Sequence, residues 1–538
     1  MTTEAIADAL KLTAQLMELH GENPFKVKAL SNAAFRLDKT NLDLDGKSPE
    51  ELEAIEGIGK GIAGKIHELQ QTGTTKELAA LLEKTPAGVV EMLNIKGIGP
   101  KKIALLWKEL GIESPGELLY ACNENRLVEL KGFGEKTQAA VKKSLEFSQA
   151  SKGKFHYADV EHVAEKIVAL LKKQLHTEHV SVTGSVRRKD IIIESIEIVA
   201  AGDEKKIDLE KADNPMQIPV HVHTCSAGEF FDVLFQTTGN AAHFKLLEHL
   251  EKKPKPHAHS EEEIFTELGL QFIPPELREG HGEITLAKHH KIPALITEKD
   301  LAGVLHNHST YSDGMNTLEE MALHCKENGY EYFGICDHSQ SAFYANGLKA
   351  DRVAQQHREI DELNRKLYPF RIFKGIESDI LNDGSLDYPK DVLASFDFIV
   401  ASVHSNLKMD KEKATARLLK AIENPYTRIL GHPTGRLLLS REGYPVDHKK
   451  IIDACAANGV VIELNAHPYR LDIDWKWIPY CMEKGVLISI NPDAHEKAGL
   501  DMHWGVCAAR KGMLTKEFCL NAKSLEEFEK WVNARREM

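Results

Sequence analysis

The sequence predicts a multidomain protein: an all-α N-terminal region, an α+β middle segment and a distorted parallel α/β barrel at the C-terminus. Three observations predict this fold class. A glycine turn recurs three times before residue 152, an apolar strand-like stretch follows Gly184, and short β-rich runs alternate with helical stretches from Leu301 onward. Because 538 residues are too many for one hydrophobic core, several domains are expected.

The recurring turn has the form Gly-apolar-Gly between two helical segments. Its copies are EGIGKGIAGKI from Glu56, KGIGPKKIALL from Lys96 and KGFGEKTQAAV from Lys131. One such turn is more often a helix-capping glycine, but three copies with adjacent lysines resemble the helix-hairpin-helix motif, which holds the DNA phosphate backbone without reading sequence. The expected DNA-binding residues are Gly57, Gly59, Lys60, Gly97, Gly99, Lys101, Lys102, Gly132, Gly134 and Lys136.

Composition sets limits on the class of protein. The net charge of −13 does not favour nucleic-acid binding by the whole surface, so DNA binding depends on a local basic face. No apolar run approaches the ~18 residues of a membrane helix, and the N-terminus lacks the pattern of a signal peptide. The eight cysteines are scattered without a C-x-x-C pair, which predicts reduced thiols. We therefore expect a cytoplasmic protein with no membrane contact.

Potential metal ligands stand at the ends of the strand-like runs in the last region. The runs are GVLHNHST, YFGICDHS, FKGIESDI, IVASVHS, RILGHPTG and VLISINPDAH; VVIELNAHP, with His467, is the exception. Active sites of parallel barrels collect at the C-terminal strand ends. We expect His306 and His308, at i and i+2 on a strand, to point to one face. The candidate metal ligands and catalytic residues are His306, His308, Asp313, His338, Glu377, His404, His432, Asp493 and His495. Imidazole and carboxylate together suit Zn, Mn or Fe.

The motifs HNHSTYSDG, CDHS, GIESDI, ASVHS, GHPTGR and NPDAH resemble those of the PHP phosphoesterase domain. The resemblance implies a distorted seven-stranded barrel with up to three divalent ions. It implies that His306, His308, Glu377 and Asp493 hold one ion, that Glu377, His404 and His432 hold a second, and that Asp313, His338 and His495 hold a third. Arg436 either steers a phosphate or forms a plain salt bridge.

The order of the segments resembles bacterial family X DNA polymerases fused to a PHP domain. The resemblance implies an N-terminal helical domain at 1–85, a helix-hairpin-helix domain at 86–152, a nucleotidyltransferase-like palm and thumb at 153–299 and a PHP domain at 300–538. It also implies a role in DNA repair on gapped, nicked or 3′-ended DNA, bound without sequence preference. We expect the protein to act as a monomer in the bacterial cytoplasm.

The palm departs from the family pattern, in which three carboxylates hold two Mg²⁺ ions. The corresponding positions are Ser195, Glu197 and His221, and the nucleotide-binding Y-F-T-G stretch is replaced by Gln236, Thr237, Thr238 and Gly239. A serine carries no charge to offset Mg²⁺, so Mg²⁺ is not expected here unless Glu197 binds it with Asp203 or Glu204. The degenerate polymerase site comprises Gly184, Ser185, Arg188, Ser195, Glu197 and His221.

Lys65 lies where the family's N-terminal domain has a lysine that forms a Schiff base with an abasic sugar. Lysine attacks only as a neutral amine, which burial or nearby positive charge favours. A second lysine usual beside it is replaced by Gly61. Lys65 is therefore either a lyase nucleophile or a lysine that contacts phosphate or solvent.

The function expected from these features is metal-dependent 3′→5′ exonuclease or 3′-end phosphoesterase activity, with templated synthesis lost. Three alternatives remain open. The chain could be a gap-filling polymerase with substituted metal ligands, a small-molecule phosphatase similar to histidinol phosphatase, or a non-catalytic scaffold at DNA ends. Primer extension with dNTPs distinguishes the polymerase from the nuclease. The DNA-binding repeats disfavour the small-molecule phosphatase, and the complete set of metal ligands disfavours the non-catalytic scaffold.

Overall fold

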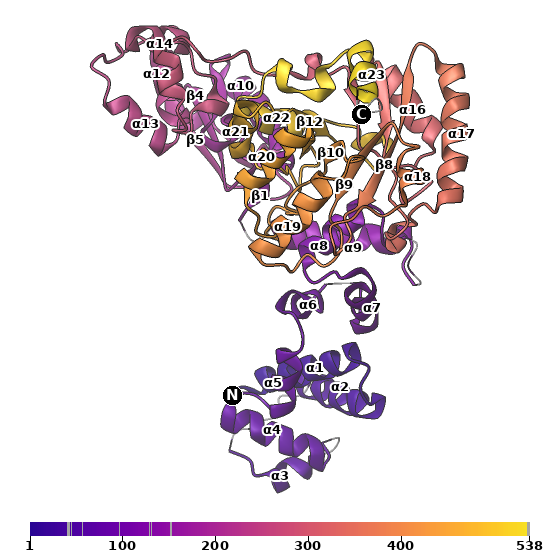
Figure 1. Cartoon of the computed structure of the whole chain (residues 1–538). Helices are drawn as coiled ribbons and strands as arrows, with labels where there is room; N and C mark the ends of the chain where they lie inside the picture. Colours follow the sequence, from indigo (N-terminus) through magenta and orange to yellow (C-terminus); the bar gives the residue numbers. More distant parts are fainter. Residues whose placement is uncertain are drawn as a thin grey trace. The chain divides into compact units, whose positions relative to one another are not determined.

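The computed structural model describes residues 1–39, 44, 46–55, 58–95, 97–128, 130, 132–150 and 153–534. The chain forms two compact units, Met1–Glu146 and Phe147–Met538 (Figure 1). The boundaries of the four sequence-predicted domains stay predictions. In the part of the chain that the structure describes, no helix is long and apolar enough to cross a membrane. All eight cysteines are free thiols.

The first unit is helical, as the sequence predicts. Its helices are α1 (Thr3–Leu19), α2 (Pro24–Lys39), α3 (Pro49–Glu53), α4 (Lys60–Thr72), α5 (Lys76–Glu83), α6 (Ala87–Met92), α7 (Pro100–Leu110), α8 (Pro115–Asn123) and α9 (Glu135–Ala150), the last continuing into the second unit. Glycines 59 and 99 are the N-caps of α4 and α7, and neither cap makes a side-chain hydrogen bond. The first-turn N–H groups of both helices, except at Pro100, which has none, therefore remain available to an anion.

The second unit begins with the α+β segment. Its elements are β1 (Phe155–His156), α10 (Tyr157–Leu175), β2 (Val180–Thr183), α11 (Gly184–Arg187), β3 (Ile192–Ile193), β4 (Ile196–Ala201), β5 (Val220–Cys225), α12 (Phe230–Thr238), α13 (Ala241–Glu248), α14 (Glu261–Leu268) and α15 (Glu283–Lys288). A small sheet has the order β2-β4-β5, with β2 antiparallel and β5 parallel to β4. The apolar face of β4 packs against α10, which buries Val160, Ile167 and Leu171.

The barrel follows as alternating strands and helices. Its elements are β6 (Gly303–Val304), α16 (Leu318–Glu327), β7 (Tyr332–Ile335), α17 (Ala350–Leu367), β8 (Arg371–Asp379), α18 (Lys390–Leu393), β9 (Phe398–Ser402), α19 (Lys411–Ile422), β10 (Ile429–Leu430), α20 (His448–Asn458), β11 (Val461–Asn465), α21 (Ile478–Glu483), β12 (Ile488–Asn491), α22 (His503–Lys511) and α23 (Leu525–Asn533). The strands pair in parallel in the order β12-β11-β10-β9-β8-β7-β6. A bridge between Asn307 and Ala494 nearly closes the barrel.

Alternation along the strands separates two apolar layers of the barrel. Phe333 and its outward neighbours pack under the surrounding helices, which Figure 1 shows outside the strands. Tyr332 belongs to the other layer and stacks on Phe528 of α23, with ring centroids 4.5 Å apart. Strands β7, β9, β11 and β12 are buried along their whole length, as expected for parallel strands covered on both faces. The C-terminal strand ends are left for polar side chains.

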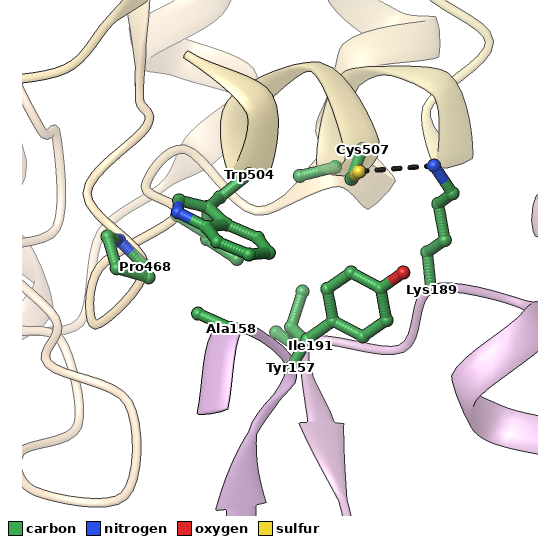
Figure 2. A pocket seen from close by; sticks show the side chains of 9 residues that line it. Tyr157, Ala158, Lys189, Ile191, Pro468, Trp504 and Cys507 are labelled. Carbon is green, nitrogen blue, oxygen red and sulfur yellow. Dashed lines mark hydrogen bonds between the residues drawn. The ribbon is translucent and has the colours of Figure 1, made fainter. Parts of the chain in front are cut away.

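The α+β segment packs directly on the barrel within the second unit. Figure 2 shows Tyr157 and Ile191 of this segment beside Trp504 and Cys507 of α22, around a small pocket. Lys189 Nζ lies 3.3 Å from Cys507 Sγ across the contact. The contact fixes the α+β segment to the barrel that carries the histidine cluster.

Candidate metal centre

The first two histidines of the cluster follow β6 rather than lying on it. The expectation that they occupy strand positions i and i+2 is wrong, because β6 ends at Val304 and His306 has a left-handed backbone with φ of +56°. The turn still brings the two rings together, with centroids 5.4 Å apart. His308 is held in place by its N–H, which donates to the Ala494 carbonyl at 2.9 Å.

Glu377, near the end of β8, lies at the centre of the cluster. Its Oε1 is 3.0 Å from His432 Nε2, 3.1 Å from His404 Nε2 and 3.3 Å from His306 Nε2. Its Oε2 is 2.9 Å from His338 Nδ1. One carboxylate therefore faces imidazoles that come from four different strand ends.

Two aspartates, Asp493 and Asp313, contact the remaining histidines of the same cluster. Asp493 Oδ1 lies 3.0 Å from His308 Nε2 and 3.6 Å from His306 Nε2. Asp313 Oδ2 lies 3.5 Å from His338 Nε2, and its Oδ1 lies 3.4 Å from His495 Nε2. Among the residues of this cluster, three sets have possible metal-ligand atoms within 4.8 Å of one another: His306 with His308 and Asp493; His338 with Glu377 and His404; and Asp313 with His308, His338 and His495. All nine sequence-predicted residues meet in one buried place.

A second layer of carboxylates orients the histidines, and the sequence analysis missed it. Glu463 Oε2 lies 2.6 Å from His306 Nδ1, and Asp379 Oδ1 lies 2.6 Å from His404 Nδ1. Each contact leaves the Nε2 atom of the ring facing Glu377. Such partners fix the ring orientation of metal-binding histidines. The available signal was an acidic residue inside an otherwise apolar buried strand, as Glu463 is in VVIELNAHP.

His467 and Arg436 stand outside the cluster. His467 Nδ1 accepts a hydrogen bond from the Tyr469 N–H at 3.2 Å, and burial lowers the pKa of this histidine to about 3. Arg436 Nη1 lies 2.6 Å from Asp474 Oδ2. Of the two roles that the sequence left open for Arg436, the structure displays the salt bridge.

The electrostatics of the cluster favour positive charge at its centre. Burial opposes a charge on His306, yet the nearby carboxylates, Glu463 foremost, raise its pKa well above the ordinary value. Against the same burial, Glu377 foremost raises the pKa of His404 to about 10. At His308, burial and the neighbouring imidazoles lower the pKa to about 3. The carboxylates thus create a strongly negative environment in which the charge of a divalent cation is stabilised.

The donors present fit divalent metal ions. Several buried atoms that could bind a metal ion have close polar neighbours but make no hydrogen bond of proper geometry with the described residues: His306 Nε2, His308 Nδ1, Asp313 Oδ2, His338 Nε2 and Glu377 Oε2. Buried polar atoms in proteins are nearly always paired, so these atoms need a partner. A mixed set of imidazole nitrogens and carboxylate oxygens suits first-row transition metals such as Zn, Mn or Fe.

The palm residues form a different environment. Glu197 on β4 pairs in register with His221 on β5, and Ser195 precedes β4. The Glu197 carboxylate packs against Gly184 so closely that any Cβ at the glycine would collide with it. None of the candidate metal clusters among the described residues includes Ser195, Glu197 or His221.

The basic side chains of GSVRR are engaged inside the protein. Arg188 Nε lies 3.0 Å from Glu279 Oε1, and its Nη1 donates to the Thr238 carbonyl at 2.8 Å. Arg187 donates to Glu261 through both terminal nitrogens. The Ser185 carbonyl accepts from the Asp190 N–H at 3.0 Å.

The glycine turns of the first unit leave open space beside them. Gly97 and Gly132 adopt left-handed backbones with φ of +95° and +86°, and nothing lies within 4 Å of a Cβ built at Gly59, Gly97, Gly99 or Gly134. Lys60, Lys101 and Lys136 are exposed and Lys102 is half-buried. Gly57 lies outside the described residues.

Lys65 has a carboxylate neighbour. Its Nζ forms an ion pair with Glu77 of α5. The neighbour is not the positive charge that would favour a neutral amine, so the geometry offers no support for a nucleophilic lysine. The lyase role stays a prediction.

The fold and the cluster define a class: a multidomain, metal-dependent phosphoesterase with DNA-binding hairpins. Family comparisons agree. A helix-hairpin-helix domain matches residues 1–75, a SAM-like helix-hairpin-helix tandem matches residues 89–146, and a PHP domain matches residues 305–467. The PHP match ends before Asp493 and His495, which the structure nevertheless brings into the cluster.

Curated relatives extend the comparison over the whole chain. The DNA polymerase/3′-5′ exonuclease PolX of Bacillus subtilis is 34% identical over 570 residues, covering 99% of each chain. The chain therefore belongs to the PolX family of family X DNA polymerase/3′-5′ exonucleases. Probable phosphatases of Acetivibrio thermocellus and Caldicellulosiruptor bescii are each 29% identical, over 35% and 40% of this chain and 78% and 87% of theirs.

Proposed function

We propose that the barrel is a metal-dependent 3′→5′ exonuclease that hydrolyses phosphoesters at the 3′ ends of gapped or nicked DNA. The observation that supports it most is that nine imidazole and carboxylate side chains, Glu377 among them, meet in one buried cluster, in a chain that belongs to the PolX family. The hairpin turns of the first unit would hold the DNA backbone without reading its sequence. The protein would act as a monomer in the bacterial cytoplasm.

The ion assignments implied by the sequence are part of the proposal. His306, His308, Glu377 and Asp493 would hold one ion, Glu377, His404 and His432 a second, and Asp313, His338 and His495 a third. Divalent ions held there would make a hydroxide nucleophile available near neutral pH and offset the charge of the phosphate ester. The chain's own contribution is orientation: Glu463 and Asp379 hold their histidine partners so that the ring nitrogens face inward.

We further propose that the palm no longer performs templated synthesis. The Glu197 carboxylate occupies the space over Gly184, and Arg188 is paired with Glu279. A negative charge at this loop repels a triphosphate, and an arginine already held by a carboxylate is not free to bind one. An active gap-filling polymerase is the rival that this part of the proposal excludes.

One gel tests both proposals. A 5′-labelled primer on a gapped template is incubated with Mn²⁺, in the presence and in the absence of dNTPs. Three proteins are compared: the wild type, His308→Ala and the control His324→Ala, which alters a histidine outside the cluster. We expect shortening that dNTPs do not change, lost in His308→Ala and retained in His324→Ala. Lengthening of the primer would overturn the palm proposal. Shortening by His308→Ala at the wild-type rate would overturn the assignment of the nuclease.

A second candidate activity is phosphomonoester hydrolysis, because two relatives are named probable phosphatases. Their similarity covers only 35% and 40% of this chain. Two substrates separate the two activities: an oligonucleotide that carries a 3′-phosphate, and a free sugar phosphate. The rates of phosphate release from the two are compared at equal substrate concentration. Preference for the sugar phosphate would favour a small-molecule phosphatase; preference for the oligonucleotide favours a DNA 3′-end enzyme.

A further inference from the structure

An exposed phenylalanine lies on the loop that follows His338. Phe343 is 76% exposed, although most large apolar side chains of the barrel are buried. Its ring lies 5.8 Å from the ring of Tyr344, which lies 6.4 Å from the ring of His338. These two contacts place Phe343 within about 12 Å of a cluster histidine. A second exposed apolar residue, Met315, follows Asp313 by two positions.

The loop that carries Phe343 is held at its start by Asp387. The Asp387 carboxylate accepts from Ser339 Oγ and from the Ser341 N–H, each at 2.7 Å. The Asp387 carbonyl accepts from Gln340 Nε2 at 2.6 Å. Three consecutive residues before the aromatic pair are therefore fixed to one neighbouring segment.

The end of the loop is equally constrained. The Leu348 N–H donates to the His338 carbonyl at 2.8 Å, and Arg352 Nη1 donates to the Asn346 carbonyl at 3.1 Å. Gly347 passes so close to the Ser339 carbonyl that a Cβ would collide with it. An exposed aromatic side chain on a loop with both ends fixed is preorganised for a ligand, because little conformational entropy is lost on binding.

We infer that Phe343 is the stacking platform for the base of the 3′-terminal nucleotide. This inference rests on the proposed nuclease function. A flat ring beside a phosphoester site can stack with any base, since every base has a π-face, and it adds affinity without sequence preference. An unpaired terminal base stacks more readily than a paired one. The platform therefore favours frayed, mismatched or single-stranded 3′ ends over fully paired ends.

The test measures steady-state hydrolysis of two 5′-labelled single-stranded oligonucleotides that differ only at the 3′-terminal residue. In the first oligonucleotide this residue carries a base; in the second it is a tetrahydrofuran without a base. We expect Phe343→Ala to raise KM about tenfold on the first oligonucleotide. The expected rise on the second is less than twofold, because it has no base to stack. Phe343→Trp should restore the wild-type KM on the first.

Tyr368→Ala is the matched control. Tyr368 is 83% exposed and follows the C-terminal end of α17, an 18-residue helix and therefore about 27 Å long. Removing it should leave KM unchanged on both oligonucleotides. If Phe343→Ala raises KM equally on both, or on neither, the stacking inference is wrong while the nuclease stands. If the wild type hydrolyses neither oligonucleotide but hydrolyses a free sugar phosphate, the proposed function itself is wrong.

Discussion

Glu463 Oε2 lies 2.6 Å from His306 Nδ1, and this contact links the middle of β11 to the first ligand candidate of the barrel. Both side chains are fully buried. The carboxylate fixes the ring so that Nε2 faces Glu377 and Asp493. It also adds negative charge to the environment of the cluster. Glu463 therefore supports a metal centre without facing it.

We expect Glu463→Gln to weaken metal binding at the cluster by about 10- to 100-fold, because the amide no longer supplies the charge that orients and polarises His306. The measurement is metal content after dialysis against a graded chelator, read by atomic emission. Glu423→Gln, at an exposed position after α19, is the control. Equal metal retention in both variants would show that Glu463 has only a packing role.

The sequence predicts the candidate metal ligands better than the carboxylates that orient them. His404 and His432 each follow a short apolar run, and parallel strands end at one side of a barrel, so their convergence follows from topology. Glu463 was not predicted because a single acidic residue inside a strand-like run forms no periodic pattern, and so does not by itself indicate that it orients a histidine. The strand placement of His306 failed for a local reason, since a single left-handed residue ends β6 early.

Ion pairs between distant segments were beyond prediction. Arg188 pairs with Glu279, 91 positions further along the chain, and Lys511 reaches both Glu279 and Asp190. Nothing in the local pattern of GSVRR indicates that its arginines are engaged. Such partners are known only when the packing of the α+β segment on the barrel is known.

Lys511 joins the barrel to the α+β segment and should be important for stability. Its buried Nζ lies 2.8 Å from Asp190 Oδ1, 2.6 Å from Glu279 Oε1 and 2.8 Å from the Arg188 carbonyl. Lys511→Met leaves two half-buried carboxylates with Arg188 as their remaining cationic partner, so the free energy of unfolding should fall by about 2 kcal/mol. Lys516→Met, which alters an exposed lysine paired with Asp300, should change it by less than about 1 kcal/mol. Thermal and urea unfolding measure both; equal losses would contradict the role of Lys511.

A functional palm binds DNA more tightly when the dNTP that matches the template base is present. We expect no such effect here, because the Glu197 carboxylate lies against Gly184 and Arg188 is engaged by Glu279. The measurement is the Kd for a gapped template with a dideoxy-terminated primer, in Mg²⁺, with matching or non-matching dNTP. Identical Kd values are the expected result. Tighter binding with the matching dNTP alone would show that the palm still reads a template.

DNA binding by the hairpin turns should depend on salt and on the lysines beside Gly99. Lys101 Nζ is 3.8 Å from Glu18 Oε1, and Lys102 Nζ is 4.9 Å from the centre of the Phe133 ring. Each lysine that contacts a phosphate contributes about 0.9 to the slope of log Kobs against log salt on duplex DNA. Changing both to alanine should reduce the slope by about 2, whatever the sequence of the DNA. Lys84→Ala, which removes a lysine paired with Glu22, should leave the slope unchanged.

His503 links the α+β segment to the barrel through charge, and its contribution should depend on pH. Its ring contacts Cys507 Sγ at 3.6 Å, Glu161 Oε2 at 2.9 Å and Glu298 Oε1 at 2.6 Å. The hydrogen bond with Cys507 and that with Glu161 raise the pKa of His503 to about 11 against the effect of burial. Other titratable groups facing this network are Lys189, beside Cys507, Tyr157, which donates to Glu161, and Asp501, which accepts from the His503 N–H at 2.8 Å.

A pKa raised in the folded state favours folding only while the imidazole is protonated. The stabilisation is complete below the unfolded pKa of ~6.5 and declines as the pH rises toward the folded pKa of about 11. His503→Gln should therefore lower the free energy of unfolding more at pH 6 than at pH 9. Urea unfolding of the wild type, His503→Gln and the control His324→Gln at both pH values measures the difference. A loss that is equal at pH 6 and pH 9 would show that His503 contributes by packing, since packing does not titrate.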